Sequence, residues 1–413
     1  MLLKNNKGGV SDMNNILDFT SKMLGIQGLE VIHTNVNSGT YTVFAKPTHI
    51  GAICPKCGRF TNVIHDVRVQ CYGHLSIWGT KTELVLQIFR LECSCDPDHP
   101  FDLTCNFIRK YQRQTIPYEI YVYELCRNNS IENVSKLTNL SHGKCQRIFN
   151  HYAQLEIANR GPIKTEYLGI DDFAVRKGHK YNTAINDLTT NSLIDIIEGR
   201  TKDEVIAYIN DLPDDFKRQI KAVSMDMSRS YCSSIIEALP NAKPVIDRFH
   251  IAQLFHNLID DARKHIQNKV RKEEGDKTKV FGIRWALLKN FEDLTAEEIE
   301  KLFKICDEYP KLGECLAIKE EFRKFFAINT KENAAAFLDY FKELVMDSGI
   351  PELQTFCKTV DRWREYILNY YDFKITNGPT EGLNHKIKNI KRRAYGYRNT
   401  TNFKIRLQAE CVS

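Results

Sequence analysis

The sequence lacks any apolar run of the roughly 18 residues that a membrane-spanning helix needs. The first residues, Met1 to Asn15, are polar and contain no apolar signal core. These absences predict a cytoplasmic, nucleoid-associated protein of prokaryotic type, with no membrane partner and with reduced cysteines. The chain also has no internal repeat and no low-complexity segment, which leaves ordinary globular domains.

Acidic residues are absent from one long stretch, since no Asp or Glu occurs from Gly382 to Ala409. The net charge of the whole chain is only +6, so the placement of charge is more informative than its sum. Such a block predicts a contact surface for a polyanion, and the alternative is a solvated basic face. The stretch carries Lys386, Lys388, Lys391, Arg392, Arg393, Arg398, Lys404 and Arg406.

The length of 413 residues predicts two to four domains, and 42% hydrophobic with 27% charged residues is a normal globular balance. Residues 14–106 are strand-rich and hold a cysteine cluster, and residues 110–160 have helical periodicity. Strands and helices alternate over residues 163–250 and resume at 371–406, while 251–370 is almost entirely helical. This order is typical of a multidomain α/β chain with a ribonuclease-H-like core and an all-α insertion.

Three carboxylates occupy places suited to metal chemistry. Apolar strands are predicted to end at Asp171 and Asp226, and Glu381 lies in the first turn of a helix that begins near Pro379. Phosphodiester cleavage is assisted by two divalent metal ions, and Mg²⁺ or Mn²⁺ prefers carboxylate oxygens. We therefore predict that Asp171, Asp226 and Glu381 are catalytic and hold Mg²⁺. The alternative is that these acids cap turns and offset a helix dipole.

Four neighbours compete for catalytic or supporting roles. Asp172 is an alternative to Asp171, because strand alternation does not decide which side chain points into the cleft. Asp247 is a further strand-end acid, and His250 follows it. His385 shares one helix face with Glu381, and that face continues with Lys388 and Arg392 at i+7 and i+11.

The thirteen cysteines are unevenly placed, with six of them between Cys54 and Cys105. Two residues separate Cys54 from Cys57, and Gly58 follows directly. This arrangement has the form of a zinc knuckle. The second pair of ligands is predicted to include Cys93, with Cys95, His99 or Cys105 as its partner. Because four protein ligands leave no open position, the predicted Zn²⁺ is structural.

Two helices, Ile131–Leu137 and Lys144–Phe149, meet at Asn139-Leu140-Ser141 and resemble a helix-turn-helix. The start of the second helix is the part that meets base edges in a major groove. We predict that this module binds DNA through His142, Lys144, Gln146 and Arg147. The basic stretch is predicted to contact DNA through Lys388, Lys391, Arg392, Arg393 and Arg398.

Several segments are similar to the insertion-sequence transposases of the ISL-three family, over about residues 16 to 406. They are Gly169-Ile170-Asp171-Asp172-Phe173-Ala174, Arg176-Lys177-Gly178-His179, Asp226-Met227-Ser228, Asp247-Arg248-Phe249-His250, Glu381-Gly382-Leu383-Asn384 and Gly396-Tyr397-Arg398-Asn399. The resemblance implies a DDE transposase with a ribonuclease-H-like core, a helical insertion, a zinc finger and the acidic triad Asp171, Asp226 and Glu381. The sequence Cys93-Ser94-Cys95 departs from the family's cysteine spacing.

The predicted function is a transposase that binds the ends of its own mobile element, nicks a strand and joins the freed 3′-hydroxyl to target DNA. Its partner is double-stranded DNA, and the pairing of two DNA ends requires at least a dimer. One alternative is a ribonuclease-H-like nuclease or resolvase without strand transfer. The other is a DNA-binding repressor derived from a transposase, whose acids are now structural.

Overall fold

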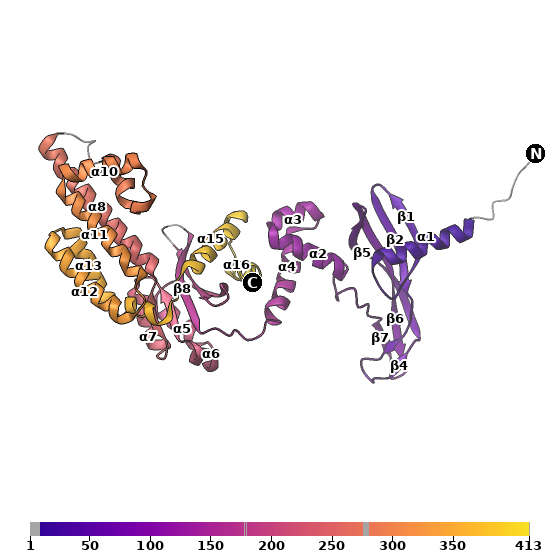
Figure 1. Cartoon of the computed structure of the whole chain (residues 1–413). Helices are drawn as coiled ribbons and strands as arrows, with labels where there is room; N and C mark the ends of the chain where they lie inside the picture. The colour runs from indigo at the N-terminus through magenta and orange to yellow at the C-terminus, as the bar shows by residue number, and fades with distance from the viewer. Residues whose placement is uncertain (1–8, 177, 179, 276–280, 413) are drawn as a thin grey trace, which may run out of the picture. The chain divides into compact units, whose positions relative to one another are not determined.

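The computed structural model describes residues 9–176, 178, 180–275 and 281–412, and the chain forms two compact units, Met1–Glu156 and Ile157–Ser413 (Figure 1). Each unit contains a β-sheet and helices. Lys177 and His179, part of the segment quoted above, lie outside the described residues.

The first unit contains a five-stranded sheet in which β1, β2, β6 and β5 are neighbours in that order and β7 pairs with β6. Two hairpins turn at Ser38-Gly39 and Trp78-Gly79, where both residues have positive φ, as a two-residue turn of type I′ requires. Helix α1 covers the core formed by Leu24, Val43 and Leu84. The elements are α1 Gly9–Leu24, β1 Leu29–Asn37, β2 Thr40–Pro47, β3 Ala52–Ile53, β4 Phe60–Thr61, β5 Ile64–Ile77, β6 Thr80–Cys93 and β7 Asp96–Asp102.

Three helices follow this sheet: α2 Ile116–Asn128, α3 Ile131–Thr138 and α4 His142–Ala158. The Ser130 hydroxyl accepts the N–H of Asn133 and caps α3, and Asn139 ends α3 in the left-handed conformation at φ 54°. The predicted pair of helices and the turn at residues 139–141 are confirmed.

The second unit contains a five-stranded sheet with the order β10-β9-β8-β11-β12. Strands β8, β11 and β12 are parallel, and β9 and β10 are antiparallel to their neighbours. Strands β9 and β10 form a hairpin, and Thr201 and Glu204 form a capping box at the start of the helix that follows. The elements are β8 Tyr167–Arg176, β9 Lys180–Asp187, β10 Ser192–Glu198, α5 Lys202–Asn210, α6 Asp214–Gln219, β11 Ala222–Met225, α7 Arg229–Ala238 and β12 Lys243–Ile246.

The prediction that the first strand of this sheet ends at Asp171 is wrong. Strand β8 continues to Arg176, because its antiparallel pairing with β9 extends past the point where its parallel pairing with β11 stops at Gly169. Asp171 and Asp172 therefore lie within a strand, just beyond the three-strand parallel part of the sheet.

An all-α segment follows β12 and then returns to the sheet. Its core is aromatic, with Phe255, Phe322, Phe341 and Phe356 in mutual contact. The helices are α8 Arg248–Glu274, α9 Arg284–Leu288, α10 Ala296–Glu308, α11 Pro310–Arg323, α12 Lys331–Ser348, α13 Pro351–Leu368, α14 Tyr370–Phe373, α15 Gly378–Arg393 and α16 Thr400–Glu410. Short 3₁₀ turns occur at Phe281–Ile283, Phe291–Asp293 and Lys324–Ala327.

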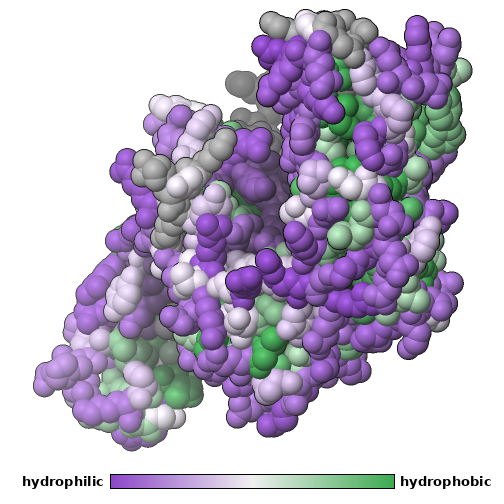
Figure 2. Space-filling view, turned by 90° about the vertical axis from the view of Figure 1, so that its left-hand side faces the viewer, coloured by the Kyte–Doolittle hydropathy of each residue, from purple (hydrophilic) through white to green (hydrophobic). Residues whose placement is uncertain are grey.

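The face in Figure 2 is dominated by hydrophilic side chains, and hydrophobic ones lie between them in separate patches. Among the described residues, no helix has the length and hydropathy required to cross a membrane.

Candidate active site and metal centre

Two of the predicted acids lie at the same edge of the sheet. Asp226 follows the last residue of β11, and Asp171 lies two residues beyond the end of the β8–β11 pairing. Asp171 accepts hydrogen bonds from the side-chain amide of Asn384 in α15 at 2.7 Å and from the N–H of Asp172 at 2.8 Å. The site is thus built from two adjacent parallel strands and one helix, at the carboxyl edge where ligands of open α/β sheets bind.

Burial and mutual repulsion disfavour the charged form of these acids. The pKa of Asp171 is raised to about 6, mainly by burial, with smaller contributions from the charges of Asp226 and Asp172. Burial also raises the pKa of Asp226. His250, in the first turn of α8, acts in the opposite direction on both groups. A half-buried site with this excess of negative charge favours the binding of a cation.

Several oxygen atoms around these acids are buried and have no hydrogen-bond partner within the described part of the chain. Buried oxygens are normally paired, and oxygens of carboxylates, amides and hydroxyls are the ligands that hard divalent cations prefer. The donor set is therefore chemically suited to Mg²⁺. The atoms are Asp226 Oδ1, Asp247 Oδ1, Asn377 Oδ1, Thr380 Oγ1 and Asn384 Oδ1.

Asp247 belongs to this group by position. It is the N-cap residue of α8 and is only 2% exposed. Burial raises its pKa, while the N–H groups of Asn377 and Phe249 and the charge of His250 act against that rise. The charge of His250 therefore acts on Asp171, Asp226 and Asp247, although no three of these four residues offer ligand atoms within 4.8 Å of one another among the described residues.

Asp171 and Asp172 are directed to different partners. While Asp171 contacts Asn384, Asp172 accepts a hydrogen bond from Arg200 Nη1 at 2.8 Å. Successive side chains of the strand point to opposite faces of the sheet. Ile170 packs on the face covered by α7, and Phe173 packs on the face covered by α15. Asp171 thus shares a side of the sheet with α15.

Glu381 is exposed in the first turn of α15. The stripe Leu383, Ile387 and Ile390 is buried, and the predicted polar face is exposed, including His385. Among the described residues, Asp171, Asp226 and Glu381 do not form a group whose oxygens all lie within 4.8 Å of one another. The helix reaches the acid site through Asn384, three residues after Glu381.

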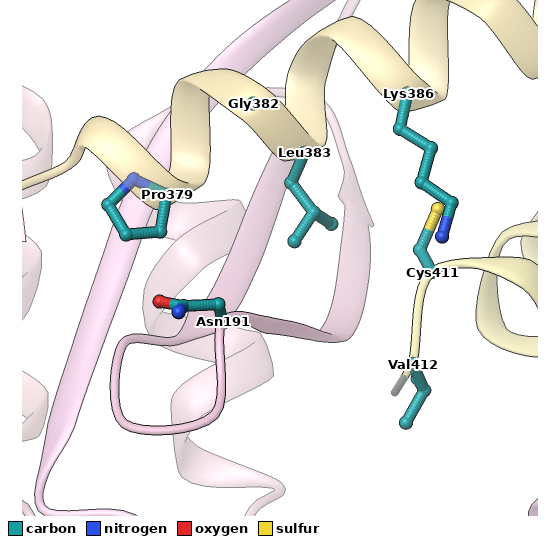
Figure 3. A pocket seen from close by; sticks show the side chains of 7 residues that line it. All are labelled: Asn191, Pro379, Gly382, Leu383, Lys386, Cys411 and Val412. Carbon is teal, nitrogen blue, oxygen red and sulfur yellow. The ribbon is translucent and has the colours of Figure 1, made fainter.

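A pocket of about 280 Å³ adjoins the first turn of α15 (Figure 3). Pro379 and Gly382 of its lining lie on either side of Glu381 in the sequence, and the Lys386 side chain extends toward Cys411. None of the three predicted acids lines this pocket. The pocket therefore adjoins the start of α15 and is not the acid site itself.

Gly169 allows α15 to approach β8 closely. A Cβ at this position would lie 2.5 Å from Thr380 Oγ1 and 3.0 Å from Asn377 Oδ1. We expect Gly169→Ala to displace the start of α15 and to lower the free energy of unfolding by about 1–3 kcal/mol, measured by urea denaturation. Gly161→Ala is the control, because no atom lies within 4 Å of its Cβ. Equal stability of the two variants would contradict the close approach.

The raised pKa of Asp171 predicts a pH-dependent stability for the metal-free protein. The pKa of Asp171 is about 6 in the folded state and higher than its ordinary value of 3.8. The contribution of Asp171 to the stability of the folded state is therefore fully present below pH 4 and is lost as the pH rises through 6. We expect Asp171→Asn to stabilise the protein at pH 8 by about 1–3 kcal/mol and to have little effect at pH 4. The side-chain amide of the new asparagine can be accommodated at position 171. Rotation of the Asn384 amide would turn Asn384 Oδ1, which has no partner among the described residues, toward the new N–H donors. Thermal unfolding at both pH values tests this, and a destabilised variant at pH 8 would contradict it.

The predicted DNA-contact residues of the basic stretch divide into two groups. Lys391 donates to two carbonyl oxygens of β8, and burial lowers its pKa. Arg393 Nη2 donates to both carboxylate oxygens of Glu410 in α16, at 2.6 and 2.7 Å. These two cations are engaged within the protein. The others are exposed: Lys388, Arg392 and Arg398.

Four cysteines of the first unit form a compact cluster. Cys54 and Cys57 come from the turn between β3 and β4, and Cys93 and Cys95 from the tight turn between β6 and β7, where Cys93 pairs with Asp96. The Sγ atoms of all four lie within 4.8 Å of one another, and two pairs are 3.6 Å apart. Tetrahedral coordination with Zn–S bonds of 2.3 Å places sulfurs about 3.8 Å apart, so the cluster fits zinc.

The hydrogen bonds of the first turn favour thiolates. The N–H of Arg59 is the main cause that lowers the pKa of Cys57 to about 6, and the N–H of Cys57 lowers that of Cys54. The contact with Cys57 is the main cause that raises the pKa of Cys95 to about 12, because crowded thiolates repel each other without a cation. His99 and Cys105, the alternatives to Cys95, lie outside the cluster: His99 contacts Asp96 and Cys105 packs on the sheet core.

The predicted contact residues of the helix-turn-helix begin α4. Ser141 accepts the N–H of Lys144 and caps the helix, while Cys145, Ile148 and Phe149 are buried. The side-chain amide of Gln146 donates to Asn150 at 2.8 Å. Of the other predicted contact residues, Lys144 is half-buried, and His142 and Arg147 are exposed.

Sequence reasoning missed Asn384, Asn377, Thr380 and Arg200. Asn377 is the N-cap residue of α15, and Thr380 and Asn384 lie in its first two turns, so the start of a helix near a predicted acid was a signal that could have found them. Arg200 stands directly before the capping box of α5 and had no pattern of its own.

Comparison with known proteins agrees with these features. Residues 168–407 match the family model of the DDE ISL3 type described as a transposase. Residues 104–153 match the helix-turn-helix domain of transposase family ISL3, and residues 51–95 match the zinc finger of the transposases of IS204, IS1001, IS1096 and IS1165. Together with the four-cysteine cluster, the last match supports a structural zinc ion.

Two relatives give the same result. The chain is 27% identical over 374 residues to the transposase for insertion sequence element IS1001 of Bordetella parapertussis, which covers 90% of this chain and 91% of that one. It is 26% identical over 252 residues to the transposase for IS1557 of Mycobacterium tuberculosis, or 56% of each chain. These matches define the class as an insertion-sequence transposase. Because the transposase model spans more than half of the sequence, the chain belongs to transposase family ISL3.

Proposed function

We propose that this transposase binds the ends of its own mobile element and catalyses metal-dependent cleavage of a DNA strand and its transfer to target DNA. The observation that carries the proposal is the pair Asp171 and Asp226 at the carboxyl edge of adjacent parallel strands, beside buried oxygens that have no hydrogen-bond partner among the described residues. The strand order β10-β9-β8-β11-β12, with helices after β10 and β11, supports a ribonuclease-H-like core.

The catalytic residues in this proposal are Asp171, Asp226 and Glu381. They would hold Mg²⁺ or Mn²⁺, which when bound supplies charge neutralisation at the phosphate and activation of the attacking oxygen. Asn384 orients the carboxylate of Asp171 through its 2.7 Å hydrogen bond. Asp247 and His250 support the site electrostatically, since the charge of His250 favours the ionised form of all three aspartates.

DNA contacts are proposed on two surfaces. The exposed face of α15 carries His385, Lys388 and Arg392 in line with Glu381, so a DNA backbone along this face would pass the acids. The start of α4 would enter a major groove and read the element end. Pairing two ends requires at least a homodimer on DNA.

The zinc ligands are proposed to be Cys54, Cys57, Cys93 and Cys95. Their four thiolates fill the coordination shell, so the ion joins the β3–β4 ribbon to the β6–β7 turn and takes no part in catalysis.

The helix-turn-helix proposal predicts a defined loss of binding. We expect Arg147→Ala to weaken binding to an element-end duplex about 10-fold and, if the contact is to a phosphate, to reduce the salt slope by about 1. Arg362→Ala, an exposed arginine of α13, is the matched control and should bind like the wild type. Fluorescence anisotropy across a salt series measures both quantities. Unchanged affinity in Arg147→Ala would contradict this docking.

The whole proposal is tested with purified protein, labelled element-end DNA, a target plasmid and Mg²⁺ or Mn²⁺. Cleaved strands followed by joined products are the expected result. Cleavage without joining would favour a nuclease or resolvase. Binding without cleavage would favour a repressor.

A further inference from the structure

Arg200 is a cation held beside the acid site. It lies between the end of β10 and the start of α5 and donates from Nη1 to Asp172 Oδ2 at 2.8 Å. Its guanidinium carbon lies 4.1 Å from the centroid of the Tyr181 ring. The side chain is nevertheless 54% exposed. Asp172 and Tyr181 therefore hold the guanidinium while solvent still reaches it.

The backbone on either side of Arg200 is fixed as well. Gly199 has φ +100°, and Glu204 Oε2 lies 2.0 Å from where a Cβ of Gly199 would be. The same Glu204 accepts the N–H of Thr201 in the capping box. The hydroxyl of Thr183 donates to the carbonyl oxygen of Gly199 at 2.8 Å. Arg200 is thus presented by a rigid junction, which is what a preorganised contact requires.

The charge of Arg200 acts on the same acids. It favours the ionised form of Asp226, one of the groups in the acid site. A guanidinium has five N–H donors, and the hydrogen bond to Asp172 engages one nitrogen. The remaining donors suit the planar, two-point recognition of a phosphate.

We propose that Arg200 binds a non-bridging phosphate oxygen of the DNA strand that is cut, with Asp172 and Tyr181 as positioning residues. This inference rests on the proposed function. It also gives Asp172 a role distinct from that of Asp171. The rival account is that Arg200 only neutralises the charge of Asp172.

Single-turnover cleavage at saturating protein separates the two accounts. We expect Arg200→Ala to slow cleavage about 100-fold and Arg200→Lys to give an intermediate rate, since lysine keeps the charge without the fork. Arg218→Ala, a 65% exposed arginine of α6, is the matched control with wild-type rate. Asp172→Asn alone should slow cleavage less than Arg200→Ala does, because the asparagine oxygen can still accept a hydrogen bond from Arg200. The double variant Arg200→Ala/Asp172→Asn should remain as slow as Arg200→Ala, and recovery toward the wild-type rate would overturn the proposal.

A neutral methylphosphonate beside the cut bond provides the second readout. It should slow the wild type, but Arg200→Ala should not be slowed further, because its contact is already lost. Equal slowing of both proteins would overturn the proposal even if Arg200→Ala were partly misfolded. Cleavage by Arg200→Ala at the wild-type rate would contradict this inference alone. Absence of cleavage by the wild type would contradict the proposed function on which it rests.

Discussion

Replacing Asp226 with alanine is expected to reduce both cleavage and joining of element-end DNA by at least about 10³-fold. The reason is that Asp226 is proposed to hold the metal that stabilises charge at the reacting phosphate. Its Oδ1 atom has no hydrogen-bond partner among the residues that the structure describes, so the truncation breaks no described hydrogen bond at that atom. Denaturing gels of labelled DNA measure both products.

The matched control for this prediction is Asp215→Ala. The Asp215 side chain is 94% exposed on α6, and its removal should leave both rates unchanged. Thermal unfolding shows whether each variant is folded. Full activity of Asp226→Ala would exclude Asp226 from the metal site, and the buried acids Asp171 in β8 and Asp247 after β12 would then need another explanation.

The second large effect is expected from Cys57→Ser. Zinc binding supplies about 10–16 kcal/mol in zinc-finger peptides, so loss of one of four thiolates should release the ion and unfold the β3–β4 ribbon. Cys57 is exposed, and the substitution itself therefore disturbs little packing. Zinc content of the purified protein and limited proteolysis measure the two consequences.

Cys71→Ser is the control for the zinc prediction. Cys71 is another exposed thiol of the same unit, but it contacts Glu83 and lies outside the cluster. It should keep one zinc ion per chain. Wild-type zinc content in Cys57→Ser would exclude the four-cysteine assignment.

Local patterns explain which parts of the fold could be predicted. The capping box at Thr201 and Glu204 and the buried stripe of α15 each depend on residues within a few positions of one another. The end of β8 was predicted wrongly, because it depends on where one neighbour stops pairing and the other continues. No pattern within the strand itself reports on that difference.

The candidate site also combines features that local sequence predicts with features that depend on distant residues. The types and order of the acids were visible in the sequence, but the contact of Asp171 with Asn384 joins residues 213 positions apart. The inward position of Lys391 could have been predicted, since it lies four residues after Ile387 at the edge of the buried stripe. The role of Cys95 depends on the tight β6–β7 turn, which brings Cys93 and Cys95 to the same side of the cluster.

The central claim is that Asp171 and Asp226 hold the catalytic divalent ion. It is tested most directly by electron paramagnetic resonance of Mn²⁺ titrated into the zinc-loaded protein bound to element-end DNA. The wild type is predicted to bind Mn²⁺ at this site, and the double variant Asp171→Asn/Asp226→Asn is predicted to lose that binding while still holding DNA. Identical Mn²⁺ binding by both proteins would contradict the claim.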